Sequence, residues 1–239
     1  VQLLETWRAA VKDPDSAVTR WLAGWAPAGI VHQPESRGFF PATTEPAEPH
    51  YSQLDGNIED FANYAGVDEN PIATEEIALR ILQGHLKAFD TALELEEFVG
   101  ATKELPAILS KIGIITKMRA GKTKHRMILD TKAALIKYVS RKGQRVILPR
   151  LLDAILQALR LMGECEDGEG VEWMVLDFTD AFWQIRLHPD ERKYFCCRIL
   201  IRGKQKFIAF LSTAQGSMGC YTHVGTPCCP DYAINAELI

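Results

Sequence analysis

The sequence lacks any apolar run long enough to cross a membrane, and no signal-peptide pattern opens it. It also lacks a CxxC pair among its six cysteines, and adjacent cysteines suit neither a disulfide framework nor a tetrahedral zinc site. We therefore expect reduced thiols in an intracellular protein without a membrane partner. The Ala-Gly-Lys-Thr stretch at residues 120–123 lacks the earlier glycine that a phosphate-binding P-loop requires, which argues against that class of nucleotide-binding protein.

Positive charge is scarce outside one segment. The net charge is −4, yet residues 111–150 hold twelve lysines and arginines and a single acid, Asp130. Residues 1–110 instead hold seven bases and eighteen acids. A basic block within an acidic chain is typical of a surface that binds a polyanion, although a solvated charged face gives the same pattern. Charge alone leaves both interpretations open.

The first hundred residues are predicted to be mainly helical. Apolar residues at helical spacing predict two short helices within residues 1–30, separated by an Asp-Pro-Asp-Ser break. Residues 31–56 are rich in proline, glutamate, serine and threonine and predict an extended linker. Residues 74–99 predict one continuous helix, with Thr74 as its N-cap and Gly100 after its end.

The second half of the chain is predicted to mix strands with helices. The Met-Ile-Leu run at residues 127–129 is a short strand candidate, and residues 149–162 predict a helix with proline in its first turn. Residues 194–201 and 206–211 are apolar runs around an Arg-Gly-Lys turn and predict a β-hairpin. We expect one of the two adjacent cysteines in its first strand to face the core.

The segment at residues 171–182 carries most of the candidate chemistry. An apolar run that predicts a buried strand ends at Asp177, and Asp180, Ala181 and Phe182 follow. A carboxylate at the tip of a buried strand is costly unless it is paired, and a divalent metal is a common partner. An aspartate that only begins a turn is the simpler alternative.

This segment resembles the first catalytic motif of reverse transcriptases from LTR or gypsy-type retrotransposons. The resemblance implies that the Asp177 carboxylate and the Phe178 backbone carbonyl hold Mg²⁺ or Mn²⁺, and that Phe182 checks the nucleotide sugar. Asp180 and Ala181 would then line the nucleotide pocket, with Asp180 also supporting the local turn. Alternatively, Phe182 is an ordinary residue of the hydrophobic core.

A second motif of the same family precedes this segment. Residues 124–130, Lys-His-Arg-Met-Ile-Leu-Asp, resemble the fingers motif that grips the incoming triphosphate. The resemblance assigns Lys124, Arg126 and Lys132 to nucleotide binding. A guanidinium fork suits phosphate geometry and stays charged at any relevant pH. The alternative is a plain ion pair between Arg126 and Asp130.

The remaining motifs extend the resemblance over residues 101–219. Residues 148–156 resemble the helix before the catalytic strand, and residues 184–189 resemble the segment after it. Gln215 and Gly216 stand where the next palm motif contacts the nucleotide and the template strand. The order of these motifs along the chain carries the assignment more than any one of them.

The family pattern stops after Gly219. The family continues with a helix and then a hairpin that carries a pair of aspartates, and residues 220–239 match neither. The cysteines and the histidine within residues 220–229 lack the rigid spacing of a zinc site. A frame change, a splice alteration or a decayed element copy would explain this tail, and the family's thumb, connection and ribonuclease H regions are missing as well.

The sequence therefore predicts an α+β fold. Residues 101–219 would form the fingers and a partial palm, after a mainly helical, acidic region at residues 1–100 and before a divergent tail at residues 220–239. The implied activity is nucleotidyl transfer onto a primer 3′ end copied from an RNA template, with an RNA/DNA template–primer, dNTP and the rest of a retroelement polyprotein as partners. Because the second aspartate motif is missing, we expect no activity from this chain alone. The alternatives are a non-catalytic nucleic-acid-binding remnant that uses residues 111–150, and a misfolded product.

Overall fold

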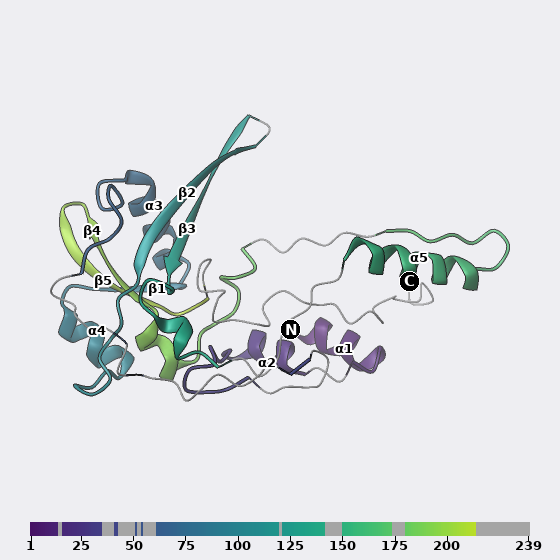
Figure 1. Ribbon diagram of the computed structural model, residues 1–239, viewed down its shortest axis with the longest axis horizontal. Helices are drawn as coiled ribbons and strands as arrows, with labels where there is room; N and C mark the ends of the chain where they lie inside the picture. Colours follow the sequence, from purple (N-terminus) through teal and green to yellow (C-terminus); the bar gives the residue numbers. More distant parts are fainter. Residues whose placement is uncertain are drawn as a thin grey trace.

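The described part of the chain combines helices with two small antiparallel sheets, which confirms the α+β class (Figure 1). The computed structural model describes residues 1–13, 16–34, 41–42, 51, 54, 61–119, 121–141, 150–173 and 180–213. Its elements are α1 (Gln2–Ala10), α2 (Ala17–Ala23), α3 (Pro71–Leu82), β1 (Leu86–Phe89), α4 (Ala92–Val99), β2 (Lys111–Arg119), β3 (Lys122–Asp130), the 3-10 helix η2 (Ile136–Tyr138), α5 (Leu151–Glu164), the 3-10 helix η3 (Pro189–Tyr194), β4 (Cys196–Ile201) and β5 (Lys204–Phe210). None of the helices in these ranges has the length and apolar character needed to span a membrane.

The larger sheet has three strands in the order β1-β5-β4, all antiparallel. Strands β4 and β5 are joined by Arg202 and Gly203, with φ angles of 52° and 73°. Positive φ at both central residues is what a tight two-residue hairpin turn requires, and the predicted hairpin is confirmed. Strand β1 pairs with the other edge of β5, from Leu86 opposite Phe210 to Phe89 opposite Phe207. One sheet thus joins residues from both sides of position 100.

The single helix predicted over residues 74–99 is wrong in this structure. Helix α3 begins earlier, because the Asn70 side chain accepts a hydrogen bond from the Ile72 backbone N–H at 3.0 Å, and Thr74 lies inside the helix. The helix stops before Gly84, whose φ of 75° suits a turn. The apolar residues that follow form strand β1, because β5 offers them an edge on which to pair. Pairing with β5 therefore outweighs the helical spacing of the apolar residues in this segment.

The C-terminal part of that predicted helix starts afresh as α4. Thr91 and Glu94 form a capping box: each side chain accepts a hydrogen bond from the other residue's backbone N–H. Gly100 ends the helix in the left-handed conformation, with φ of 65°. The predicted end of the helix is therefore confirmed, although its predicted beginning is wrong.

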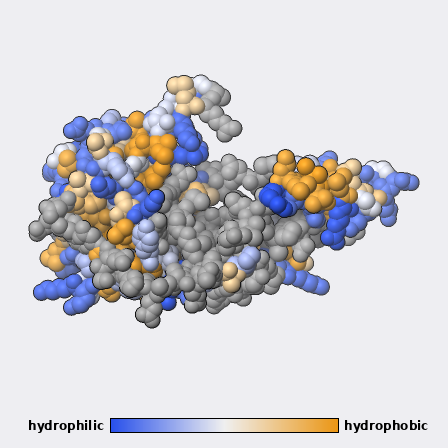
Figure 2. All heavy atoms as spheres, in the orientation of Figure 1, coloured by the Kyte–Doolittle hydropathy of each residue, from blue (hydrophilic) through white to orange (hydrophobic). Residues whose placement is uncertain are grey.

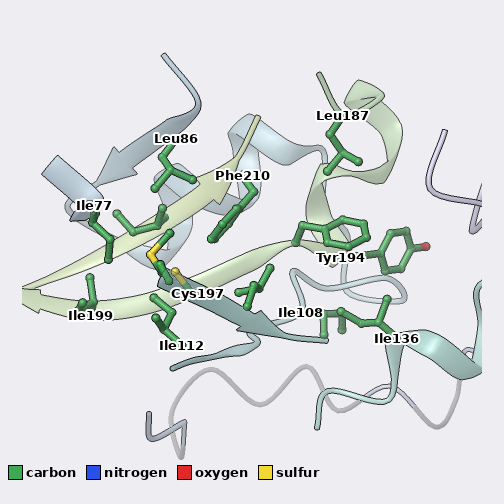
Figure 3. Packing of buried hydrophobic residues seen from close by; sticks show 14 of the residues in the cluster. Ile77, Leu86, Ile108, Ile112, Ile136, Leu187, Tyr194, Cys197, Ile199 and Phe210 are labelled. Atoms are coloured by element: carbon green, nitrogen blue, oxygen red, sulfur yellow. The ribbon is translucent and has the colours of Figure 1, made fainter. Parts of the chain in front are cut away.

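In the described ranges, the hydrophobic core forms two clusters. One contains residues from α3, β1, β2 and η3, among them Ile77, Leu86, Ile112 and Tyr194 (Figure 3). The other packs α4 against β4 and β5, with these buried members: Leu95, Val99, Ala107, Leu109, Cys196, Phe207 and Ala209.

The adjacent cysteines of β4 point into different clusters. Cys196 belongs to the cluster under α4, and Cys197 belongs to the larger cluster. Both are fully buried, and burial raises the pKa of each thiol. We expected one of them to face the core, and both do, because Leu95 and Val99 of α4 belong to the same cluster as Cys196.

Helices predicted elsewhere in the chain are confirmed, with one difference in packing. Helices α1 and α2 lie on either side of the Asp-Pro-Asp-Ser break. Helix α5 begins at Leu151 with Arg150 as its N-cap, so the prediction that Pro149 lies in its first turn is wrong. No residue of α5 is buried, so its apolar face is open on the surface (Figure 2). Most of the predicted linker at residues 31–56 lies outside the described residues.

The strand predicted to end at Asp177 falls mainly on residues that the structure does not describe, so it stays a prediction. Residues 171–173 adopt no regular structure, and the side chain of Trp173 is 66% exposed. Residues 174–179 lie outside the described part of the chain.

Candidate nucleic-acid interface

Strands β2 and β3 form a two-stranded hairpin that extends away from the larger sheet (Figure 1). Their register runs from Lys111 opposite Asp130 at the base to Arg119 opposite Lys122 at the tip. The base is anchored in the core, since Met127 and Leu129 are buried. Toward the tip the strands are exposed. The short strand predicted at residues 127–129 is therefore the anchored end of a longer one.

One face of this hairpin is basic. Residues directly opposite each other in an antiparallel pair point to the same face, and alternate residues along a strand share that face. Lys117 is opposite Lys124, and Arg126 and Lys122 lie two residues from Lys124 on either side. All four side chains are exposed. These residues, Lys117, Lys122, Lys124 and Arg126, are called the basic hairpin face below.

The cations of the basic hairpin face have no anionic partner in the part of the chain that the structure describes. None of the four forms an ion pair there. Lys117 and Lys124 stand directly opposite each other, and like charges in that position destabilise a strand pair by roughly 0.2–1 kcal/mol. A bound polyanion would remove this repulsion.

The base of the hairpin is fixed by Asp130. Its carboxylate accepts hydrogen bonds from the backbone N–H groups of Lys132 and Ala133, both at 3.0 Å, and from the hydroxyl of Tyr64. Burial opposes ionisation of this carboxyl, but the three hydrogen bonds hold its pKa below the ordinary value. The alternative pairing of Arg126 with Asp130 is not observed. Lys132, predicted to bind nucleotide, is an exposed residue of the turn that Asp130 stabilises.

Asp180 is held by a buried arginine of α3. Two oxygens of its carboxylate accept hydrogen bonds from Arg80, at 2.7 and 3.4 Å. Arg80 is only 7% exposed, and its Nε also donates to Glu76 at 2.7 Å. The Arg80 hydrogen bonds lower the pKa of Asp180, and the charge of Lys124 lowers it further.

The backbone of Asp180 has φ of 52°, in the left-handed region that aspartate tolerates better than most residues. Ala181 and Phe182, both half-buried, follow it. The backbone carbonyl of Phe182 accepts a hydrogen bond from the Thr213 hydroxyl. The fully packed aromatic residue is its neighbour Trp183, which is 7% exposed.

Sequence reasoning missed both Arg80 and Trp183. The Arg80 guanidinium lies 4.9 Å from the centroid of the Trp183 ring, and the His85 ring lies 5.7 Å from it. Burial lowers the pKa of His85, and the nearby charge of Arg80 lowers it further. A signal for Arg80 was present in the sequence: it follows the core residue Ile77 by three positions, so it lies on the buried side of α3.

Four of the predicted site residues lie outside the described part of the chain: Asp177, Phe178, Gln215 and Gly216. The tail at residues 220–239 lies outside it as well. The expected Mg²⁺ or Mn²⁺ ligands therefore stay predictions. In comparisons with known proteins, no family model, no curated protein and no solved structure matches this chain.

Proposed function

We propose that this chain is a fragment of a retroelement reverse transcriptase, and that its basic hairpin face binds the phosphates of an RNA/DNA template–primer or of dNTP. The observation that carries the proposal is the basic hairpin face itself: four exposed cations on one side of two paired strands, without an ion-pair partner in the described ranges. Lys124 and Arg126 belong to the motif that the resemblance assigns to triphosphate binding.

The spacing of these cations suits an extended chain of phosphates. Cross-strand neighbours lie about 5 Å apart, and alternate residues along a strand lie about 7 Å apart. The hairpin is anchored at its base by Met127, Leu129 and the Asp130 turn, so the cations are presented on a supported element. Arg126 can engage a phosphate with two parallel N–H donors, whereas the lysines act as point charges.

The catalytic part of the proposal rests on the resemblance. Asp177 and the backbone carbonyl of Phe178 would hold Mg²⁺ or Mn²⁺, which in polymerases supports in-line displacement at the nucleotide phosphate. Within these 239 residues no match to the family's aspartate pair follows. We therefore expect the chain on its own to bind template–primer without extending it, which makes a non-catalytic nucleic-acid-binding remnant the second candidate function.

The binding proposal is tested by fluorescence anisotropy with a labelled RNA/DNA template–primer over a range of salt concentrations. If four cations contact single-stranded phosphates, the logarithm of the association constant falls with the logarithm of salt with a slope of about −3. Arg126→Ala and Lys124→Ala should each weaken binding and flatten that slope by about 0.7. The matched control is Lys103→Ala, an exposed lysine that does not belong to either strand of the hairpin. Equal losses in all three variants, or binding that ignores salt, would contradict the proposal.

A primer-extension assay in magnesium and in manganese buffer separates the two candidates. Binding without extension is the expected result and favours the remnant. Extension that disappears in Asp177→Asn would instead show that this chain is catalytic by itself. Asn removes the metal-binding charge with little change of shape, so the anisotropy measurement should be unaffected in that variant.

A further inference from the structure

Two imidazoles and a carboxylate meet at a surface site far along the chain from the basic hairpin face. The His32 Nε2 atom lies 2.8 Å from Asp190 Oδ2, and His188 Nδ1 lies 3.7 Å from the same oxygen. The centroids of the two imidazole rings are 4.0 Å apart. One nitrogen or oxygen atom from each residue lies within 4.8 Å of the other two.

This cluster is held in place from beneath by Glu191. Its carboxylate is fully buried and accepts hydrogen bonds from the backbone N–H groups of Ile30, Val31 and His32, at 2.9, 2.8 and 3.1 Å. A further bond comes from the N–H of Ala28. Glu191 follows Asp190 directly, so the same turn that presents Asp190 also fixes the backbone of His32.

The other side of the site is braced by a short parallel bridge. The Ala26 N–H donates to the carbonyl of Arg186 at 2.7 Å, and the His188 N–H donates to the carbonyl of Ala26 at 3.0 Å. The Trp25 ring lies edge-on to His188, with centroids 6.2 Å apart. Both histidine backbones are therefore tied together before any ligand arrives, which is the support that a binding site needs.

We infer that His32, His188 and Asp190 form a binding site for a divalent transition-metal ion such as Zn²⁺. Two imidazoles and one carboxylate are the ligand set that catalytic zinc sites and non-haem iron sites use, with positions left open for water. Imidazole ligands select such ions over Mg²⁺, which takes oxygen ligands. Zinc–nitrogen bonds of about 2.1 Å place ligand atoms roughly 3.4 Å apart, close to the separations seen between these side chains.

The alternative is a simple hydrogen bond between His32 and Asp190, and it explains fewer of the features described above than a metal site does. That pair does not need a second imidazole beside it, nor a buried carboxylate that binds four backbone N–H groups to position one of its members. None of the metal site's residues belongs to the basic hairpin face, so the metal site does not depend on phosphate binding there.

The test is a titration of the purified full chain with Co²⁺, a coloured substitute for Zn²⁺, followed by visible absorption. We expect one saturable equivalent, and at least about a tenfold loss of affinity in His188→Ala, Asp190→Asn and His32→Gln. His125→Ala is the matched control, because that histidine lies on β3 and contacts Thr116 instead. Circular dichroism melting of each variant verifies its fold, and His32→Gln changes an accessible side chain that is 44% exposed.

The cysteines of the tail need a separate control, since thiolates also bind Co²⁺. Sulfur ligands add a strong near-ultraviolet charge-transfer band that imidazole and carboxylate ligands lack. Binding without this band, retained when Cys220, Cys228 and Cys229 are all changed to serine, supports the site. The inference is overturned by the absence of saturable binding, by equal binding in His188→Ala, or by binding that is lost with the three cysteines.

Discussion

At the scale of single residues, the ion pair of Asp180 with Arg80 makes stability depend on pH. The folded-state pKa of Asp180 is lowered, so its contribution is fully present above the unfolded-state value of about 3.9 and is lost as pH falls through the folded value. Asp180→Asn should lower the free energy of unfolding by about 1 kcal/mol at pH 7. The figure is modest because the Asp180 side chain is 42% exposed and solvent screens the pair.

That prediction is checked by urea unfolding of the parent chain and of Asp180→Asn between pH 7 and pH 3. The difference in unfolding free energy between the two should shrink in acid, because the parent carboxylate becomes neutral there. Asparagine tolerates the positive φ at this position, so the substitution adds no backbone strain to the difference in unfolding free energy. The control Asp167→Asn, in an exposed turn, should stay within about 0.5 kcal/mol of the parent. A constant or widening difference would show that the ion pair does not act in this way.

The sequence could indicate these residues but not their partners. Asp180 was recognisable as part of a turn after an apolar run, yet Arg80 lies a hundred positions earlier in the chain. Glu191 had no recognisable signal at all, because its partners are backbone N–H groups of residues 28–32, which every sequence possesses. Contacts of this kind depend on how distant segments pack, and local spacing does not encode them.

At the scale of elements, the helices and hairpins with strong local signals were predictable. The β4–β5 hairpin has a glycine in its tight turn, where φ is positive, and α4 has a capping box and a terminal glycine. Strand β1 was not predictable, since its four residues continue a helical pattern and become a strand only because β5 pairs with them. The strand predicted to end at Asp177 stays a prediction, because only residues 171–173 of that apolar run are described.

The β2–β3 hairpin should gain stability when one of its opposed lysines is removed. Lys124→Thr ends the repulsion with Lys117 and introduces a residue that favours strands, so the free energy of unfolding should rise by roughly 0.2–1 kcal/mol at low salt. The gain should shrink at high salt, where the repulsion is screened. The same variant should bind template–primer more weakly. Thermal melting and anisotropy, measured on one preparation, check both effects.

Met118→Thr is the control for this trade between stability and binding. Met118 lies on the same hairpin but on its other face, opposite Thr123, and it is 78% exposed. The change adds the same strand-favouring residue without altering charge, so binding should stay at the parent level. Two results would contradict polyanion binding by the basic hairpin face. One is a loss of stability in Lys124→Thr, and the other is a loss of binding in Met118→Thr as large as that in Lys124→Thr.

At the scale of the whole molecule, the central sheet couples the two halves of the chain. Strand β1 comes from the acidic first hundred residues, and its sheet partner β5 lies within the segment that resembles a polymerase. Strand β4 contributes Cys197 to one hydrophobic cluster and Cys196 to the other. If the clusters unfold as one cooperative unit, both thiols become accessible in the same event.

Native-state alkylation followed by tandem mass spectrometry tests this cooperativity. Cys196 and Cys197 should react at equal, slow rates, because both are buried and burial raises the pKa of their thiols. Cys165, half-buried at the end of α5, should react much faster and serves as the internal control. Adding urea should accelerate the two buried thiols in parallel, with a slope that matches global unfolding. Earlier labelling of Cys196 than of Cys197 would mean that the cluster under α4 opens by itself, and that β4 separates two units instead of joining them.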